Sequence, residues 1–472
     1  MKTTLSRLSA IFATSFLVLF LMRSIHWVQH MFKRVNFDEI AIVLSTGATG
    51  TDSELLMSFI KDCFMPALGI AAAIMIICHI FRSKRFVAPI MLGLCFVWLI
   101  FEMSVSKIEL GSFFNFHKSN FYESEYVAPD TVNITWSKKR NVLFIALESI
   151  EKAYGDPDVF NPILTPEITE LEKKNISFNN YNSISGLSHT IAAITGFTTG
   201  LPLFYTRIRK IEKMLGVKDG IGTIFQNNGY QTWSIFPATG RFSLKENFMR
   251  RMGFETILDG EKIYADIVQK NMETPERLFG GVDDGTLFEY SKPIIQDIIK
   301  SKKPYFIFIE TVNTHLKGYP TEYCRKLGFP QETMADITMC DDKIIGDFVK
   351  WFRKADPTAV IILVDDHAQS AGTLMETLTK IDNRTLSNVF INTNVFDGAN
   401  FNRPITAMDF FPTVIESAGG IIDGCRLGLG VSLTKRCENT QTLRERYNDS
   451  ELQQNMEQKN DLYYYLASGK KK

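Results

Sequence analysis

The sequence has no excess of charge of either sign. Lys and Arg together number 52, as do Asp and Glu, so the 472-residue chain has a formal net charge of zero. This balance argues against a polyanionic partner, and no nucleic acid is expected to bind. Internal repeats and low-complexity tracts are also missing. The four cysteines beyond residue 104 lack Cys-x-x-Cys spacing and a neighbouring His, which argues against zinc-binding or catalytic roles for them.

The first quarter of the chain holds three long apolar runs. Residues 8–28, 64–81 and 86–103 are each long enough to cross a bilayer, provided that Arg23 extends to the interface. The short basic turn 82–85 is expected to stay cytoplasmic. The N-terminus is then cytoplasmic, and everything after about residue 104 lies outside the cytoplasm. A cleaved signal peptide is the alternative for residues 8–22, although no small-x-small cleavage site follows them.

The outer cysteines are even in number, which fits an oxidising compartment. They are Cys324, Cys340, Cys425 and Cys437. Local pairing would join the first to the second and the third to the fourth. Four reduced thiols are the alternative.

Beyond a polar linker, the chain alternates between strand and helix patterns. Apolar runs at 141–147, 230–236, 305–311, 359–364 and 387–392 predict strands, and residues 284–300 and 336–354 predict amphipathic helices. This alternation predicts an α/β fold with a mainly parallel sheet sandwiched by helices, after an N-terminal α-helical membrane domain. We expect a membrane domain at 1–105, a linker at 106–139, a catalytic domain at 140–435 and a polar C-terminal tail at 436–472, which is either a peripheral helix or partly disordered.

Four residues in this region suggest a metal site. Glu148 follows the buried run 141–147, and Asp366 and His367 follow the run 359–364. Because the carboxyl ends of parallel strands meet at one edge, these side chains are expected to lie close together. Thr190 is expected in the first turn of a helix, where free N–H groups favour an anion. A divalent ion held by the other three would activate its hydroxyl, whereas each residue alone also has a structural explanation.

Three further residues are candidates for binding a phosphate. His315 follows the run 305–311, so it is expected at the same edge, although a lone histidine is more often a hydrogen-bonded surface residue. Arg241 and Lys245 lie four apart and would share a helix face, where they could clamp a phosphodiester. A solvated basic face is the alternative for this pair.

These segments together resemble the phosphoglycerol transferase and lipoteichoic acid synthase family of the alkaline phosphatase/sulfatase superfamily. The resemblance covers roughly residues 140–435. It is carried by Leu147-Glu-Ser-Ile-Glu-Lys-Ala-Tyr154, Leu164-Thr-Pro-Glu-Ile168, Thr190-Ile-Ala-Ala, Gly200-Leu-Pro-Leu-Phe204, Arg241-Phe, Met252-Gly-Phe254, Thr311-Val-Asn-Thr-His315, Asp366-His367, Met408-Asp-Phe-Phe-Pro-Thr413 and Leu427-Gly-Leu-Gly430. The sequence departs from the family pattern at His189, where an aromatic is common, and at Thr198-Thr-Gly200.

The resemblance implies the role of each candidate residue. Thr190 matches the nucleophile, and Glu148, Asp366 and His367 match metal ligands beside it. One divalent ion is implied, Mn²⁺ or Mg²⁺, while the donor set also suits Zn²⁺. His315 matches a substrate-phosphate position, and Arg241 and Lys245 fall where the family has headgroup contacts. The segment holding Cys324 and Cys340 is similar to a paired region in glucan-modifying members.

The implied activity is transfer of a phosphoglycerol headgroup from phosphatidylglycerol through a phosphothreonine-type intermediate. The acceptor would be an extracytoplasmic glycan or glycerophosphate, and the protein would be a multi-pass protein of a bacterial inner membrane whose catalytic domain faces the periplasm. Two rivals stand beside it, a phosphoethanolamine transferase and a non-catalytic, membrane-tethered binding module. A sulfatase is disfavoured because Thr190 is not followed by the Pro and Arg of a Cys/Ser-x-Pro-x-Arg motif.

Overall fold

A computed structural model gives the structure of the chain. It describes residues 2–31, 57–84, 86–105, 118–204, 216–315, 318–330, 332–370 and 372–469. These residues form two compact units, one N-terminal and one comprising residues 118–469. The first third of the expected linker, 106–117, and the last three residues of the expected tail lie outside the described residues.

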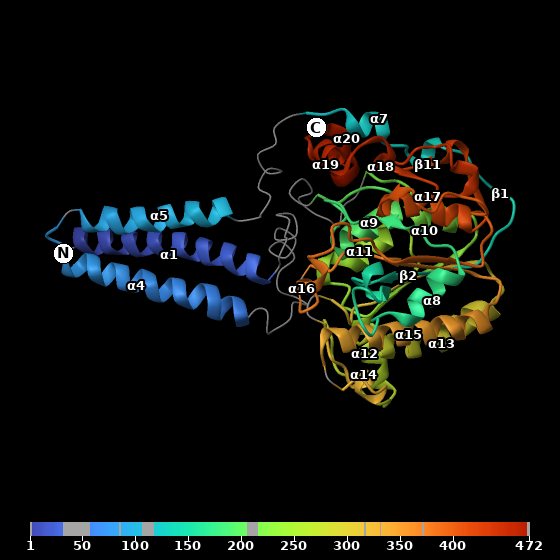
Figure 1. The fold of residues 1–472 in the computed structure, drawn as a ribbon, viewed down its shortest axis with the longest axis horizontal. Helices are drawn as coiled ribbons and strands as arrows, with labels where there is room; N and C mark the ends of the chain where they lie inside the picture. The colour runs from blue at the N-terminus through green and yellow to red at the C-terminus, as the bar shows by residue number, and fades with distance from the viewer. Residues whose placement is uncertain are drawn as a thin grey trace. The chain divides into compact units, whose positions relative to one another are not determined.

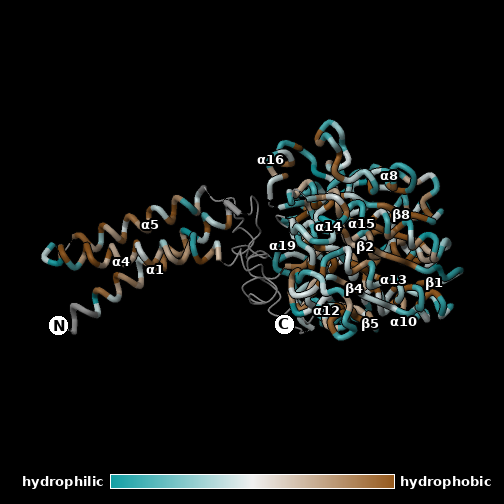
Figure 2. Tube along the Cα trace, turned by 90° about the horizontal axis from the view of Figure 1, so that it is seen from below, coloured by the Kyte–Doolittle hydropathy of each residue, from teal (hydrophilic) through white to brown (hydrophobic). Residues whose placement is uncertain are grey.

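The N-terminal unit consists of apolar helices (Figure 1). They are α1 (Lys2–Met31), the π-helical turn η1 (Ile60–Phe64) that leads into α4 (Met65–Ile80), and α5 (Val87–Val105). Figure 2 shows hydrophobic colour along most of their length. The stretches Ser6–Val28, Met57–Ile80 and Val87–Ser104 are long and apolar enough to cross a membrane. The three apolar runs predicted from the sequence therefore form three helices of spanning length.

A six-stranded sheet forms the centre of the second unit. Its order is β5 (Thr256–Asp259), β4 (Gln231–Phe236), β6 (Tyr305–Glu310), β2 (Val142–Leu147), β7 (Val360–Asp365) and β8 (Asn388–Ile391). All neighbours are parallel except β7 and β8. The predicted α/β class with a mainly parallel sheet is confirmed, and the antiparallel edge strand makes the sheet mixed.

Helices cover both faces of this sheet because its central strands are apolar on both sides. Alternate residues of β2 enter different cores: Phe144 packs in one cluster and Ile145 in the other. The first cluster contains side chains of α9 (Thr190–Thr199), α10 (Ile221–Asn227), α11 (Lys245–Arg251) and α17 (Ala407–Ser417). The second contains side chains of α8 (Pro166–Lys174), α12 (Gly260–Gln269), α13 (Asp284–Lys300) and α15 (Met334–Ala355).

Smaller elements complete the second unit. Three two-stranded sheets pair β1 (Ile134–Trp136) with β10 (Gly420–Ile422), β3 (Asn180–Tyr181) with β9 (Pro404–Ile405), and β11 (Arg426–Leu427) with β12 (Gly430–Val431). Within the described residues, the remaining α-helices of this unit are α7 (Phe121–Glu125), α14 (Glu322–Lys326), α16 (Met375–Leu378), α18 (Leu443–Arg446), α19 (Asp449–Glu457) and α20 (Asp461–Ser468).

The end of the chain packs onto the same core. Helices α18 to α20 lie within the segment expected as a polar tail, and they bury Leu443, Leu452, Met456 and Tyr463 in the first cluster. Both local cysteine pairs, Cys324–Cys340 and Cys425–Cys437, are disulfides. The first joins α14 to α15, and the second closes a short loop after β10.

Candidate active site

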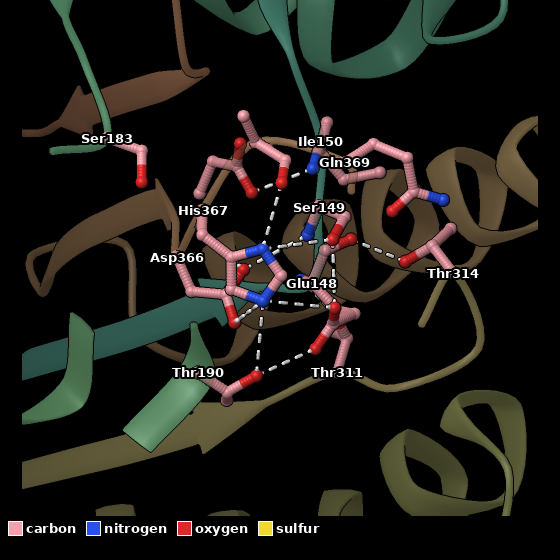
Figure 3. Close-up of polar contacts among 12 residues, drawn as sticks. Glu148, Ser149, Ile150, Ser183, Thr190, Thr311, Thr314, Asp366, His367 and Gln369 are labelled. Atoms are coloured by element: carbon pink, nitrogen blue, oxygen red, sulfur yellow. Dashed lines mark hydrogen bonds and ion pairs between the residues drawn. The ribbon is translucent and has the colours of Figure 1, made fainter. Parts of the chain in front are cut away.

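The carboxyl end of the sheet gathers the predicted residues. Glu148 follows β2, and Asp366 and His367 follow the neighbouring strand β7. A donor atom from each lies within 4.8 Å of the other two, and all three residues are buried. Figure 3 shows both carboxylates and the Thr190 side chain around the His367 ring. The adjacency of the two central strands thus brings together residues more than 200 positions apart.

The hydroxyl of Thr190 lies against this cluster from another element. Thr190 is the first residue of α9, as the sequence predicted, and His189 takes the N-cap position without a side-chain cap. The Oγ1 atom of Thr190 donates to Glu148 Oε2 at 3.2 Å and lies 3.4 Å from His367 Nε2 (Figure 3). The helix N-terminus behind this hydroxyl favours negative charge near it.

The ring of His367 is oriented with Nε2 toward the cluster. Its Nδ1 lies 3.1 Å from the carbonyl oxygen of Ala368, which accepts a hydrogen bond when Nδ1 carries the proton. Nε2 is then an electron-pair donor, 3.5 Å from Glu148 Oε1 and 3.6 Å from Asp366 Oδ2. This is the arrangement that a metal-binding histidine requires.

The negative charge of the cluster also favours the binding of a cation. Burial and the nearby charge of Glu148 raise the pKa of Asp366 to about 6, although the N–H of Ser149 donates to it. Two carboxylates buried this close repel each other unless a positive charge compensates them. The donor set of two carboxylates, one imidazole and one hydroxyl therefore fits a hard or borderline divalent ion.

Neighbouring loops hold Glu148 in place. Its backbone N–H donates to Thr311 Oγ1 at 2.9 Å, and its carbonyl oxygen accepts from Thr314. Ser149 Oγ donates to Glu148 Oε1 at 2.9 Å. Ser149 has a φ of 55°, a left-handed conformation that costs energy in a residue other than glycine and is concentrated at functional sites.

A pocket opens beside Thr190. Its lining includes Lys245, Glu310 and His315 as well as Glu148 and Thr190. The ring of His315 packs edge-on against Phe279, with centroids 5.0 Å apart. Burial lowers the pKa of His315 to about 4, so the ring is neutral at pH 7 and can offer hydrogen bonds there.

The structure separates Arg241 from Lys245. The expected shared helix face is wrong, because α11 begins only at Lys245 and the residues Ser243 and Leu244 before it have positive φ values of 52° and 54°. Arg241 is exposed and pairs with Glu261 at 2.7 Å, outside the pocket lining. Lys245 is buried and pairs with Glu310.

Glu310 is a pocket residue that the sequence reasoning did not single out. It ends the buried strand β6, just as Glu148 comes directly after the buried strand β2. A carboxylate at the end of an apolar strand was the signal that identified Glu148, and the same signal was present here. Ser149, Thr311 and Thr314 carried no comparable signal, since their roles depend on contacts between loops.

The mixed sheet with its buried acidic and histidine cluster defines a protein of the alkaline phosphatase superfamily fold. The chain belongs to the sulfatase family, whose model matches residues 140–421.

Curated relatives share about a quarter of the matched sequence. Phosphoglycerol transferase I of Escherichia coli is 26% identical over 264 residues, which cover 52% of this chain and 33% of that protein. The enzyme of the same name from Citrobacter koseri is 26% identical over 262 residues, with the same shares covered. The match thus spans about a third of the length of these relatives.

Solved structures show the same fold. An alkaline phosphatase superfamily protein from Vibrio parahaemolyticus has a TM-score of 0.53 at 20% identity, covering 67% of this chain and 77% of that one. The lipoteichoic acid synthase LtaP from Listeria monocytogenes has a TM-score of 0.51 at 16% identity, covering 64% and 79%. The lipooligosaccharide phosphoethanolamine transferase A from Neisseria meningitidis has a TM-score of 0.50 at 13% identity, covering 86% and 83%.

Proposed function

We propose that the protein is a metal-dependent phosphoglycerol transferase that takes its headgroup from phosphatidylglycerol. The observation that carries this proposal is the Thr190 hydroxyl at the N-terminus of α9, within hydrogen-bond reach of Glu148 and His367. The relatives named phosphoglycerol transferase I support the choice of headgroup.

Glu148, Asp366, His367 and Thr190 would hold one divalent ion, for which Mn²⁺ or Mg²⁺ is proposed and Zn²⁺ is also compatible. When bound, such an ion lowers the pKa of a coordinated hydroxyl and offsets the charge of a phosphodiester oxygen. The three buried ligands would fix its place next to the threonine.

Thr190 would act as the nucleophile. Its Oγ1 forms a bond to the phosphorus of the lipid headgroup, and the bond from phosphorus to the diacylglycerol oxygen breaks. The hydroxyl proton passes to solvent, and the departing diacylglycerol oxygen takes up a proton from solvent. An acceptor hydroxyl then attacks the same phosphorus and loses its proton to solvent. The bond from phosphorus to Thr190 breaks, and the threonine oxygen takes up a proton from solvent. The free N–H groups of the α9 N-terminus stabilise the phosphate in both steps.

Pocket residues would position the headgroup. His315 and Lys245 line the pocket beside Thr190, and we propose that both bind the headgroup. Arg241 lies outside that lining, so any contribution from it is proposed for the entry of the lipid rather than for the reacting phosphate. Positioning of this kind supplies much of the rate in phosphoryl transfer.

The three apolar helices fit a lipid substrate. We propose that residues 1–105 anchor the protein in a bacterial inner membrane and that a catalytic domain at about 140–435 faces the periplasm. The two disulfides support an oxidising compartment for that domain. The proposed acceptor is a glycan or a glycerophosphate chain outside the cytoplasm.

A phosphoethanolamine transferase is the second candidate. The fold likeness to the phosphoethanolamine transferase from Neisseria meningitidis supports this second candidate. A non-catalytic tethered module is less well supported, because the described structure retains a complete set of buried ligands beside the hydroxyl.

The test uses full-length protein and vesicles that contain phosphatidylglycerol. The protein with Mn²⁺ is expected to release diacylglycerol, and Thr190→Ala is expected to reduce release at least about a thousandfold, because the nucleophile is lost. Thr190→Ser, which keeps a hydroxyl, is the matched control and should retain measurable release. Full activity in the alanine variant would overturn the assignment.

A further inference from the structure

A buried ion pair lies in the pocket beside Thr190. Lys245, the first residue of α11, donates from Nζ to Oε2 of Glu310, the last residue of β6. Their side chains are only 7% and 3% exposed. The ammonium of Lys245 also lies 5.2 Å from the centre of the Phe236 ring. Both charged residues line the pocket, so a bound headgroup would meet them directly.

One oxygen of the Glu310 carboxylate takes no part in this ion pair. Glu310 Oε1 is buried and has no hydrogen-bond partner among the described residues. Burial raises the pKa of the Glu310 carboxyl, and the neighbouring Lys245 opposes that rise. A buried carboxylate oxygen without a donor is costly, so it marks a place where a ligand can supply one.

The pair has both kinds of hydrogen-bonding group to offer. Glu310 Oε1 needs a donor, and Lys245 Nζ has N–H bonds beyond the one it gives to Glu310. A hydroxyl donates and accepts, so a single hydroxyl can satisfy both atoms. An ammonium only donates, so it would leave the lysine N–H groups unmatched and would also be repelled by the charge of Lys245.

We infer that the Lys245–Glu310 pair selects an uncharged polyhydroxyl headgroup and disfavours one that carries an ammonium. This inference rests on the proposed function and assigns specificity to two residues of the same pocket. The net charge of the pair is zero, so a neutral diol such as glycerol enters without an unbalanced charge. A site lacking the lysine would present a bare carboxylate that attracts an ammonium.

The test compares two lipids on the full-length protein with Mn²⁺. Diacylglycerol release is measured from vesicles of phosphatidylglycerol or phosphatidylethanolamine with the same acyl chains, and the ratio of their kcat/KM values is taken. Lys245→Met leaves the carboxylate alone and should lower this ratio at least about tenfold. Glu310→Gln leaves the cation alone and should keep the ratio at or above the unmodified value. Lys262→Met, a surface lysine that also pairs with a glutamate, is the matched control and should leave it unchanged.

A ratio that falls in Lys245→Met but does not fall in Glu310→Gln would not follow from a purely structural role. Because breaking a buried pair can destabilise the fold, the double variant Lys245→Met/Glu310→Gln removes both charges together, and its ratio should lie between those of the single variants. Thermal melting checks that each variant is folded. Equal losses for both lipids in all variants would overturn the inference, while no Thr190-dependent release from either lipid by the unmodified protein would instead overturn the proposed function.

Discussion

His367 and Glu148 occupy positions that leave little freedom to their side chains. The imidazole is fixed by the carbonyl of Ala368 on one side, and the carboxylate by the hydroxyl of Ser149. Supporting hydrogen bonds of this kind orient metal ligands and limit the reorganisation needed when a metal binds. The backbone N–H of Ser149 donates a hydrogen bond to Asp366 Oδ1 at 3.1 Å, which helps to hold Ser149 in its strained backbone conformation.

Glu148→Gln tests the metal site at the level of one residue. The amide keeps the shape of the side chain but removes a negative charge, so Mn²⁺ affinity is expected to fall at least about tenfold. Isothermal titration calorimetry, with Mn²⁺ titrated into metal-stripped, full-length protein, measures this affinity. Glu261→Gln, which changes the carboxylate that pairs with Arg241, is the control. An unchanged affinity in the Glu148 variant would show that the ion binds elsewhere.

Single residues show what the sequence could and could not predict. Glu148, Asp366, His367 and Thr190 were predictable because each stands at a strand end or helix start, and parallel strands align those ends. The pairing of Lys245 with Glu310 was not, because the position of Lys245 depends on a backbone turn at Ser243 and Leu244 that the sequence does not mark.

At the scale of elements, the helix–strand alternation predicted most of the sheet. The five predicted strands all form, because each is a short run of β-branched and aromatic residues. Strand β5 has only four residues, too few for a clear strand pattern, so it was not predicted. The break before α11 was also hidden, since Ser243 and Leu244 adopt positive φ without a glycine or proline to mark the turn.

The contact between α8 and α15 predicts how the stability of the folded protein depends on pH. Asp342 of α15 accepts from the N–H groups of Glu167 and Ile168 at 2.8 and 2.9 Å, at the start of α8. Burial nevertheless raises the pKa of Asp342 to about 7 from its ordinary value of 3.8. The folded state therefore holds the proton of the Asp342 carboxyl more tightly than the unfolded state does. The contribution of this proton to the free energy of unfolding is fully present below about pH 4 and is lost as pH rises through about 7.

Asp342→Asn removes this titration from the helix contact. The unfolding free energy of the variant, relative to the unmodified protein, should increase from pH 4 to pH 7 by on the order of 3 kcal/mol. A constant offset from the lost hydrogen bond does not alter that trend. Urea unfolding at a series of pH values measures it, with Asp347→Asn on the exposed face of the same helix as control. A difference that stays flat or shrinks with pH would contradict the assignment.

At the scale of the whole molecule, the chain combines two units of different character. Three apolar helices of spanning length precede an α/β unit with two disulfides and a buried acidic and histidine cluster. The apolar runs were sufficient to predict the three helices, and the strand–helix alternation was sufficient to predict the α/β sheet. The packing of α18 to α20 onto the core was not apparent, because α18 and α19 are mostly polar and charged and the apolar run at 462–467 is short.

Thr190 is proposed to carry the headgroup between donor and acceptor, and this role can be tested directly. Full-length protein with Mn²⁺ is incubated with phosphatidylglycerol labelled in its glycerol headgroup, quenched with acid, digested and analysed by mass spectrometry. A labelled glycerophosphate adduct is expected on the peptide that contains Thr190, and no adduct is expected in Thr190→Ala. A labelled adduct on another residue, or diacylglycerol release with the same rate and no adduct in the alanine variant, would contradict it.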